Sequence, residues 1–243
     1  METKKITRGS AMLVAHRGLS GLERENSAAA FIAAGNRAYW GIETDLHKTA
    51  DGIFVTIHDS MTGRVAEADV CVEECTYEQL QQIHLKNAAG DSASRIDLRI
   101  PTLDDYMEIC HKYGKVAMLE LKTPFDEQTM RDMLDVIRTH DHLDQTVFIS
   151  FLWEDLVLLR QLLPDHPMQF LTYQEFTDEL FQQLLHYKFD LDIEYHVLSQ
   201  EIVDRLHNAG RKVNVWTVDE PEVATNLLSW GADYITSNIL EYS

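Results

Sequence analysis

The chain of 243 residues carries 40 acidic and 21 basic side chains, which gives a formal net charge of −19. Its length suits one α/β barrel, and a hydrophobic content of 45% allows a sizeable buried core. The charge argues against a nucleic-acid-binding protein, because phosphate backbones are bound by clustered Lys and Arg. If the substrate is an anion, the site itself must supply a cation, an Arg or a Lys.

The sequence contains no apolar run of membrane-spanning length, and its first residues, METKKITRGSAMLVAHRG, do not form a secretory signal. Three cysteines, an odd number, predict free thiols and a cytoplasmic protein. The alternative is a zinc site in which Cys71 and Cys75 are joined by His84 or by Cys110 and His111. That spacing fits no common zinc pattern.

Short apolar runs alternate with longer amphipathic stretches, a pattern typical of repeated βα units and a parallel sheet. Eight strands are predicted at residues 12–16, 42–47, 116–121, 146–150, 168–172, 189–193, 212–217 and 233–236. Helices are predicted at residues 27–38, 103–113, 127–139, 153–163, 178–186, 199–208 and 221–230, most with apolar residues three and four apart. The fold class is therefore α/β, and eight such strands predict a closed (β/α)8 TIM barrel.

The region from about residue 51 to residue 101 interrupts this alternation. It contains a strand-like run at 53–57, a short helix around 77–84 and the polar stretch AAGDSASR. We interpret it as an insertion after the second strand of a single domain spanning residues 1–243. The chain also ends soon after the eighth strand, which leaves no room for a full eighth helix.

Acidic side chains occupy two neighbouring strands of the predicted barrel. Active sites of such barrels lie at the C-terminal ends of the strands. Glu43 and Asp45 are two residues apart, as are Glu120 and Lys122, so each pair projects to one side. Three converging carboxylates repel one another unless a cation neutralises them, and oxygen ligands suit Mg²⁺, Ca²⁺ or Mn²⁺. Alternatively, the carboxylates are solvated or are paired with Arg17 and Lys122.

Two histidines also end strand-like runs. The first strand ends in HRG at residues 16–18, and GIFVTIHD contains His58. His16 and His58 form a natural acid–base pair, because imidazole accepts and donates protons near neutral pH. Arg17 and Lys122 are candidates for holding phosphate oxygens, with surface ion pairing as the alternative. Eight further histidines lie in or beside predicted helices and loops, where a structural role is expected: His84, His111, His140, His142, His166, His186, His196 and His207.

The motifs of the chain follow a family order. They are HRG, then ENS with Phe31, then GIETDLHKTADGIFVTIHD, IPTLDD and LELK, and finally VNVWTVDE with GADYITSN. In this order and spacing they resemble the glycerophosphodiester phosphodiesterases. The resemblance covers roughly residues 12 to 238. Each motif alone is a weak signal, but the ordered set is specific.

The resemblance implies an enzyme that hydrolyses glycerophosphodiesters, small-molecule substrates, to glycerol 3-phosphate and an alcohol. It leaves open the preferred alcohol, the order in which the histidines act, and whether water or a glycerol hydroxyl is the nucleophile. It also implies one divalent cation, Mg²⁺ or Ca²⁺, with Mn²⁺ as a further candidate. The implied site residues are Glu43, Asp45 and Glu120 as metal ligands, His16 and His58 as acid and base, Arg17 and Lys122 at the phosphate, and Trp216 at the substrate entrance.

The chain departs from the family pattern at two places. The usual Pro-Glu-Asn-Thr is RENS at residues 24–27, in which Ser27 can still cap the following helix and Asn26 is expected to fix the loop. The usual Thr-Asp after the eighth strand is Thr236-Ser237, so one acidic group at the mouth is missing. Residues 63–99 are candidates for setting selectivity for the alcohol.

Two other functions remain open at this point. A lysophospholipase D-like or sphingomyelinase-like activity on the same barrel would need an exposed apolar rim, for which Phe148, Phe151, Leu152 and Trp153 are candidates. A phosphate-ligand binding protein without catalysis would need neither histidine. The presence of both His16 and His58 favours an enzyme.

Overall fold

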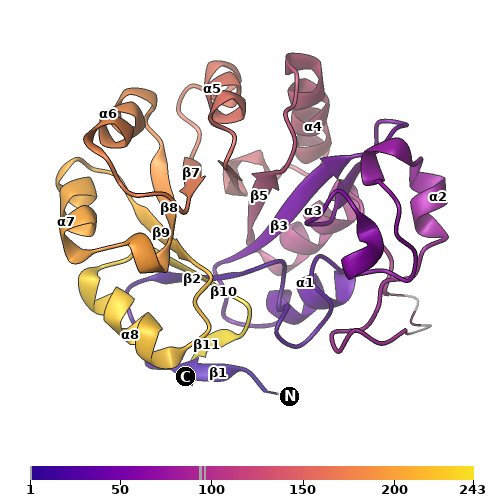
Figure 1. Cartoon of the computed structure of the whole chain (residues 1–243), viewed down its shortest axis with the longest axis horizontal. Coiled ribbons are helices and arrows are strands. Elements are labelled where there is room, and N and C mark those ends of the chain that lie inside the picture. Colours follow the sequence, from indigo (N-terminus) through magenta and orange to yellow (C-terminus); the bar gives the residue numbers. More distant parts are fainter. Residues whose placement is uncertain (1, 93–94, 96) are drawn as a thin grey trace.

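A computed structural model describes residues 2–92, 95 and 97–243. Eight parallel strands close into a barrel, because β10 pairs with β2 and β2 pairs with β3 (Figure 1). In barrel order they are β2 (Met12–Ala15), β3 (Gly41–Lys48), β5 (Val116–Leu121), β6 (Thr146–Ser150), β7 (Met168–Thr172), β8 (Asp190–Glu194), β9 (Val213–Trp216) and β10 (Tyr234–Ser237). The predicted (β/α)8 barrel is confirmed.

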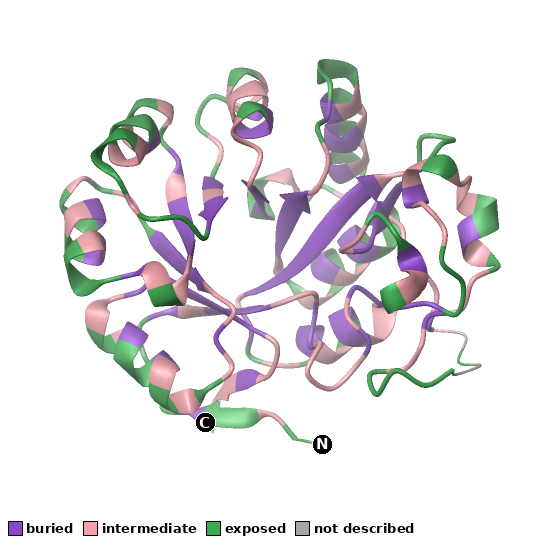
Figure 2. Ribbon diagram, in the orientation of Figure 1, coloured by how far each residue is buried: buried purple, intermediate pink, exposed green. Residues whose placement is uncertain are grey.

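Seven helices connect these strands and cover the outside of the barrel. They are α1 (Ala28–Gly35), α3 (Leu103–Tyr113), α4 (Glu127–Thr139), α5 (Trp153–Leu162), α6 (Asp178–Tyr187), α7 (Gln200–Asn208) and α8 (Pro221–Trp230). Each buries one face on the strands and exposes the other, as the colouring of Figure 2 shows. In α4 the buried face is Met130, Met133, Leu134 and Ile137, three and four residues apart, and Asp126 caps its first turn.

The barrel interior below its mouth contains an apolar cluster and a buried polar pair, Asn214 and Gln169. Val14, Met118, Val147, Ile149, Leu171 and Tyr234 form a separate buried cluster inside the ring of strands. The larger core lies between strands and helices. Because side chains alternate along a strand, the residues that face inward near the strand ends are held on a rigid frame.

Residues between β3 and α3 form a small unit on one side of the barrel. β4 (Phe54–Thr56) pairs antiparallel with β3, and η1 (Thr62–Arg64), η2 (Val72–Glu74) and α2 (Tyr77–Gln81) follow. The unit has its own apolar cluster around Val72, Leu80 and Leu98. Part of the AAGDSASR stretch lies outside the described residues. That residues 51–101 are an insertion within one domain stays a prediction.

A pair of short strands occupies the position where an eighth helix would pack. β1 (Lys4–Ile6) and β11 (Leu240–Tyr242) run parallel, beside α8 (Figure 1). Ile6 and Leu240 belong to the main core. On the side of α1, the Tyr39 hydroxyl donates to the Leu240 carbonyl at 2.7 Å. Strand pairing therefore closes the face that the sequence left uncovered.

Among the described residues, no helix is long and apolar enough to cross a membrane.

Candidate active site

Three buried carboxylates meet at the mouth of the barrel. Glu43 and Asp45 project from β3, and Glu120 projects from β5, directly opposite Asp45 in the strand register. Their exposed fractions are 3%, 0% and 8%. One oxygen from each lies within 4.8 Å of the others. The predicted convergence is therefore present in the fold.

The electrostatics of this triad favour a cation. Burial and the neighbouring carboxylates raise the pKa of Glu43 and raise that of Glu120 to about 8. Burial acts the same way on Asp45, but Arg17 and Lys122 outweigh it and lower the Asp45 pKa. The Asp45 Oδ1 atom is buried and has no hydrogen-bond partner. Clustered carboxylate oxygens with an unpartnered atom form a donor set that fits a hard divalent cation.

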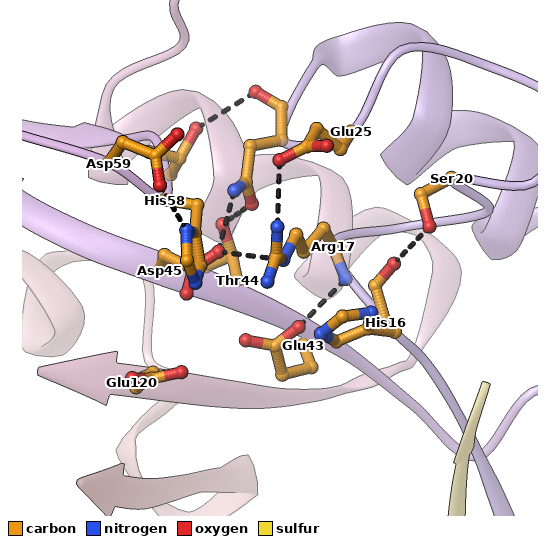
Figure 3. A network of polar contacts seen from close by, with 12 residues as sticks. His16, Arg17, Ser20, Glu25, Glu43, Thr44, Asp45, His58, Asp59 and Glu120 are labelled. Atoms are coloured by element: carbon orange, nitrogen blue, oxygen red, sulfur yellow. Dashed lines mark hydrogen bonds and ion pairs between the residues drawn. The ribbon is translucent and has the colours of Figure 1, made fainter. Parts of the chain in front are cut away.

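Arg17 and Lys122 border the carboxylates. The Arg17 Nε atom lies 3.3 Å from Asp45 Oδ2. The backbone N–H of Arg17 donates to Glu43 Oε2 at 2.7 Å. The Lys122 Nζ atom lies 2.7 Å from Glu120 Oε1 and 3.4 Å from Asp45 Oδ1. Arg17 reaches this position from the left-handed region, with φ of 54°. Both side chains are paired with the triad, and Figure 3 shows Arg17 beside Asp45 and Glu43.

His16 follows β2 and is oriented by residues from two other loops. Its Nδ1 lies 2.8 Å from Asn238 Oδ1, and the Asn238 amide donates to Asp219 Oδ2 at 2.6 Å. Because a carboxylate only accepts, Asp219 fixes the amide so that its oxygen faces His16. Nδ1 must then carry the hydrogen, which leaves a lone pair on Nε2. Burial and the charge of Arg17 lower the pKa of His16 to about 4.

His58 follows β4 and belongs to an ion-pair chain along the rim. Its Nδ1 lies 2.6 Å from Asp59 Oδ1. The Arg64 guanidinium lies 2.5 Å from Asp59 and 2.8 Å from Glu25. Glu25 in turn lies 2.9 Å from the Arg17 guanidinium. The small unit between β3 and α3 is thereby tied to the loop after β2. Burial lowers the pKa of His58, although Asp45 acts in the opposite direction.

His47 and Asn26 support the site from below. The His47 Nε2 atom lies 3.2 Å from the His58 carbonyl, and its Nδ1 lies 2.5 Å from Glu73 Oε1. The Asn26 side chain donates to Asp45 Oδ2 at 2.7 Å and accepts from the Thr44 hydroxyl at 2.7 Å. Asn26 is 3% exposed, and both ends of its amide are hydrogen-bonded to β3. It therefore fixes the loop, as expected.

A narrow cavity of about 80 Å³ opens between the two histidines and the strand ends of the far side. His16, His58 and Glu120 line one side. Phe151 and Trp216 line the other and meet edge to face, with ring centroids 5.6 Å apart. Tyr173, 63% exposed, extends this aromatic wall outward, 5.8 Å from Phe151.

The apolar rim proposed from the sequence is smaller than expected. Phe148 is fully buried in the core, and Trp153 packs among Phe170, Tyr187 and Phe189. Of the candidates from the sequence, Phe151 lines the cavity. Residues 148 and 153 face the helices because one points outward from β6 and the other begins α5.

A larger cavity, of about 400 Å³, opens at the opposite end of the barrel. Its cationic side chains are already occupied. The Arg160 guanidinium donates to backbone carbonyls, Lys188 lies 3.2 Å from Asp165, and Lys212 lies 3.1 Å from the Tyr234 hydroxyl. Size alone therefore does not mark the functional site.

Sequence reasoning missed Asp219, Asn238 and His47. Asp219 and Asn238 follow β9 and β10, so the rule that sites lie at C-terminal strand ends could have drawn attention to them. Asn238 contacts His16, and Asp219 contacts Asn238, only after the barrel closes between β10 and β2. Ser237, which stands where the family usually has Asp, donates to Asp219 Oδ1 at 2.9 Å. A carboxylate from the neighbouring loop therefore occupies this part of the mouth.

A model of the glycerophosphoryl diester phosphodiesterase family matches residues 16–241. The chain belongs to this family. A glycerophosphodiester phosphodiesterase of Bacillus subtilis is 26% identical over 246 residues, covering 93% of this chain and 83% of the relative. One from Caldanaerobacter subterraneus subsp. tengcongensis is 27% identical over 233 residues, covering 93% of each chain.

Solved structures give the same family. A phosphodiesterase of Oleispira antarctica, in complex with the product sn-glycerol-3-phosphate, matches with a TM-score of 0.84 at 26% identity. The match covers 93% of this chain and 92% of that chain. This member of the glycerophosphoryl diester phosphodiesterase family is therefore a phosphoric diester hydrolase on a TIM barrel.

The zinc site considered from the sequence is wrong for the part of the chain that the structure describes. Cys71, Cys75 and Cys110 are free, and Cys110 is buried. Within the described ranges, Glu43, Asp45 and Glu120 are the one group of three or more potential metal ligands. Its oxygen atoms suit a hard cation better than zinc.

Proposed function

We propose that this chain uses His16 and His58 for acid–base hydrolysis of glycerophosphodiesters to glycerol 3-phosphate and an alcohol. The observation that carries the proposal is the placement of two histidines beside one buried carboxylate triad at the barrel mouth. The alternative of a non-catalytic phosphate-binding protein gives no reason for two oriented imidazoles. The small-molecule substrate would enter the cavity between these histidines and the aromatic wall.

Binding of the phosphodiester falls to cationic groups, since the protein as a whole is strongly acidic. Glu43, Asp45 and Glu120 would hold one divalent cation, Mg²⁺ or Ca²⁺, which when bound withdraws charge from the phosphoryl oxygens. Arg17 and Lys122 lie beside the triad, and Arg17 also lines the cavity, so these two side chains are the groups that would hold the phosphate. Arg offers a planar fork, whereas Lys offers a point charge.

The hydrogen-bond partners distinguish the two histidines. The Asn238 oxygen holds His16 with a lone pair on Nε2, and Arg17 disfavours its imidazolium form. We assign His16 as the base that takes a proton from water as the water oxygen bonds to phosphorus. The Asp59 carboxylate stabilises the imidazolium of His58. His58 would give its proton to the alcohol oxygen as the phosphorus–oxygen bond breaks.

The test is turnover of two single variants. His16→Ala and His58→Ala should each lower turnover by at least roughly a hundredfold, the usual effect of losing acid–base catalysis. The melting temperatures of both variants should stay close to that of the wild type, which shows that the fold is intact. His186→Ala is the matched control, because this residue lies in α6, distant in sequence from both motifs. Wild-type turnover in either folded variant would remove that histidine from the mechanism.

A panel of substrates and cations identifies the preferred cation and the preferred alcohol. Glycerophosphocholine, glycerophosphoethanolamine, glycerophosphoglycerol and lysophosphatidylcholine are each assayed with Mg²⁺, Ca²⁺ and Mn²⁺. We expect activity on the first three classes and loss of activity in chelator. Preference for lysophosphatidylcholine would instead indicate a lysophospholipase D-like enzyme.

A further inference from the structure

We infer that Asp192 forms a subsite for the hydroxyl groups of the glycerol half of the substrate, the half that stays on the phosphate. This inference rests on the proposed function and adds the orientation of the substrate within the cavity. Asp192 lies on β8, across the cavity from the catalytic histidines, and lines the same cavity as Glu120. It plays no part in the acid–base steps assigned above.

The Asp192 side chain is buried and only half used. It is 2% exposed, and its Oδ2 atom accepts from the Asn214 amide at 3.1 Å. The Oδ1 atom is also buried and has no hydrogen-bond partner. A buried polar atom without a partner carries a desolvation cost, so such atoms in native proteins need a reason. A ligand hydroxyl entering the cavity would supply the missing hydrogen bond.

The surrounding network prevents Asp192 from turning to another protein group. The two hydrogens of the Asn214 amide go to Asp192 and, at 3.0 Å, to Gln169. The Asn214 oxygen accepts from the Thr236 hydroxyl at 3.1 Å. With Asn214 held on both sides, Asp192 Oδ2 is fixed, and the Asp192 side chain stays at the cavity that it lines. The geometry is therefore set before a ligand binds, which lowers the entropy cost of recognition.

The remaining lining matches glycerol rather than a charged head group. Thr236, which like Asp192 bonds to Asn214, adds a hydroxyl to the lining, while Leu171 and Trp216 provide apolar surface. Glycerol presents hydroxyl groups along one edge and carbon–hydrogen surface elsewhere, so both types of contact are satisfied. The exposed Tyr173 lies farther out along the aromatic wall, so the departing alcohol would occupy the mouth and leave to solvent.

Asp192 is also distinct from the cation site. The clustered ligand atoms comprise Glu43, Asp45 and Glu120 without Asp192. A role in holding the cation would change the response of the protein to Mg²⁺, whereas a glycerol subsite would change only substrate preference. This difference separates the two roles experimentally.

The experiment compares two substrates that share choline. Glycerophosphocholine carries the glycerol hydroxyls, whereas propyl phosphocholine has a propyl group in place of the glyceryl group and lacks them. Asp192→Leu should lower kcat/KM for glycerophosphocholine by roughly tenfold, the effect of losing one buried hydrogen bond. It should change kcat/KM for propyl phosphocholine by less than roughly threefold. The melting-temperature rise caused by Mg²⁺ should be unchanged.

The matched control is Gln169→Leu. It breaks the other hydrogen bond of Asn214, but Gln169 lines the cavity at the opposite end of the barrel. We expect it to leave the ratio of the two kcat/KM values unchanged. If Asp192→Leu does not fold, Asp192→Asn is used, and wild-type inhibition by sn-glycerol 3-phosphate is compared with inhibition by propyl phosphate. The glycerol compound should inhibit more strongly.

Four results would overturn the subsite. Equal losses on both substrates would place Asp192 in the shared chemistry, and a reduced Mg²⁺ response would place it at the cation. Equal kcat/KM of the wild type on both substrates would remove the glycerol subsite while leaving a phosphodiesterase. A wild type that cleaves neither substrate would contradict the proposed function itself and the subsite with it.

Discussion

The tautomer of His16 is set by a chain of three residues. Asp219 accepts from the Asn238 amide, and the Asn238 oxygen faces His16 Nδ1 at 2.8 Å. An imidazole whose Nδ1 carries the hydrogen presents Nε2 as an acceptor, which a general base requires. The orientation of this histidine thus depends on a residue that need not touch the substrate.

Asn238→Leu removes the acceptor and should lower kcat by roughly tenfold or more, because His16 can then adopt the wrong tautomer or rotate away. KM should change little, since Asn238 acts through His16. The measurement is kcat and KM on glycerophosphocholine, with the pH dependence of kcat. Ser20→Ala is the control: Ser20 also lies 2.7 Å from the Asn238 oxygen, but its loss leaves the bond to His16 in place. Equal effects in the two variants would contradict the positioning role.

At the level of elements, β1 and β11 replace a helix. Ile6 and Leu240 enter the core that elsewhere is covered by helices, and Tyr39 joins the pair to the segment after α1. The stability of this face therefore depends on two strands of three residues each. Such short strands gain most of their stability from the side chains that they bury.

Leu240→Ala should lower the free energy of unfolding by about 2–5 kcal/mol, because Leu240 is 0% exposed and truncation leaves a cavity. For a chain of this size the melting temperature should fall by roughly 4–20 °C. The matched control is Ile32→Ala on α1, where the side chain is 41% exposed and the fall should be much smaller. Thermal unfolding followed by circular dichroism gives the melting temperatures of the two variants. Equal small falls in both would show that β11 does not close the core.

Elements with strong periodicity were predictable from the sequence, whereas the three-residue strands β1 and β11 were not. The strands at 116–121, 146–150 and 168–172 and the helices at 103–113, 127–139 and 221–230 have the predicted bounds. The helix predicted at 27–38 ends at Gly35, and the one at 77–84 ends at Gln81. Residues 36–38 and 82–84 are compatible with helix locally, so tertiary packing decided where each helix ended.

The same distinction holds for the candidate site. The carboxylates and His16 could be proposed because each lies in or directly after an apolar strand of recognisable pattern. β1 and β11 were missed because strands of three residues carry no periodicity and their pairing joins opposite ends of the chain. The Asp219–Asn238–His16 chain was missed because it exists only after the barrel closes.

At the scale of the molecule, the net charge of −19 and the triad act together. The carboxylates are buried inside an acidic protein, so a bound cation reduces their mutual repulsion. Without a cation, protonation of the carboxylates reduces it instead. This is why burial and Asp45 raise the pKa of Glu120 to about 8. Cation binding and proton binding therefore compete at this site.

The competition predicts a pH dependence. Without cation, the folded state holds the Glu120 proton up to about pH 8, against an ordinary value of 4.5. The stability contributed by this group is complete below pH 4.5 and is lost as the pH rises through about 8. The melting temperature in EDTA should accordingly fall across this window, and the rise caused by Mg²⁺ should grow. Glu120→Gln should flatten the fall in EDTA, whereas an equally steep fall would assign it to another group.

A cation bound at the triad should stabilise the folded protein. The unfolded chain cannot hold Glu43, Asp45 and Glu120 together, so the cation should bind the native state almost exclusively. At about a hundred times its dissociation constant, such a ligand adds about 2.7 kcal/mol to the free energy of unfolding. For a chain of this size that is a rise in melting temperature of about 5–11 °C over the chelated protein.

Glu120→Gln tests whether the triad is the source of that rise. The variant should lose most of the increment in Mg²⁺ or Ca²⁺, because one ligand charge is gone. In EDTA above about pH 8, where Glu120 is ionised, it should be at least as stable as the wild type, since a repulsive charge within 4.8 Å of two others has been removed. The measurement is a thermal melt of both proteins, with EDTA and with excess cation. If both proteins respond equally little to the cation while the wild type remains active in EDTA, the triad does not hold a catalytic cation.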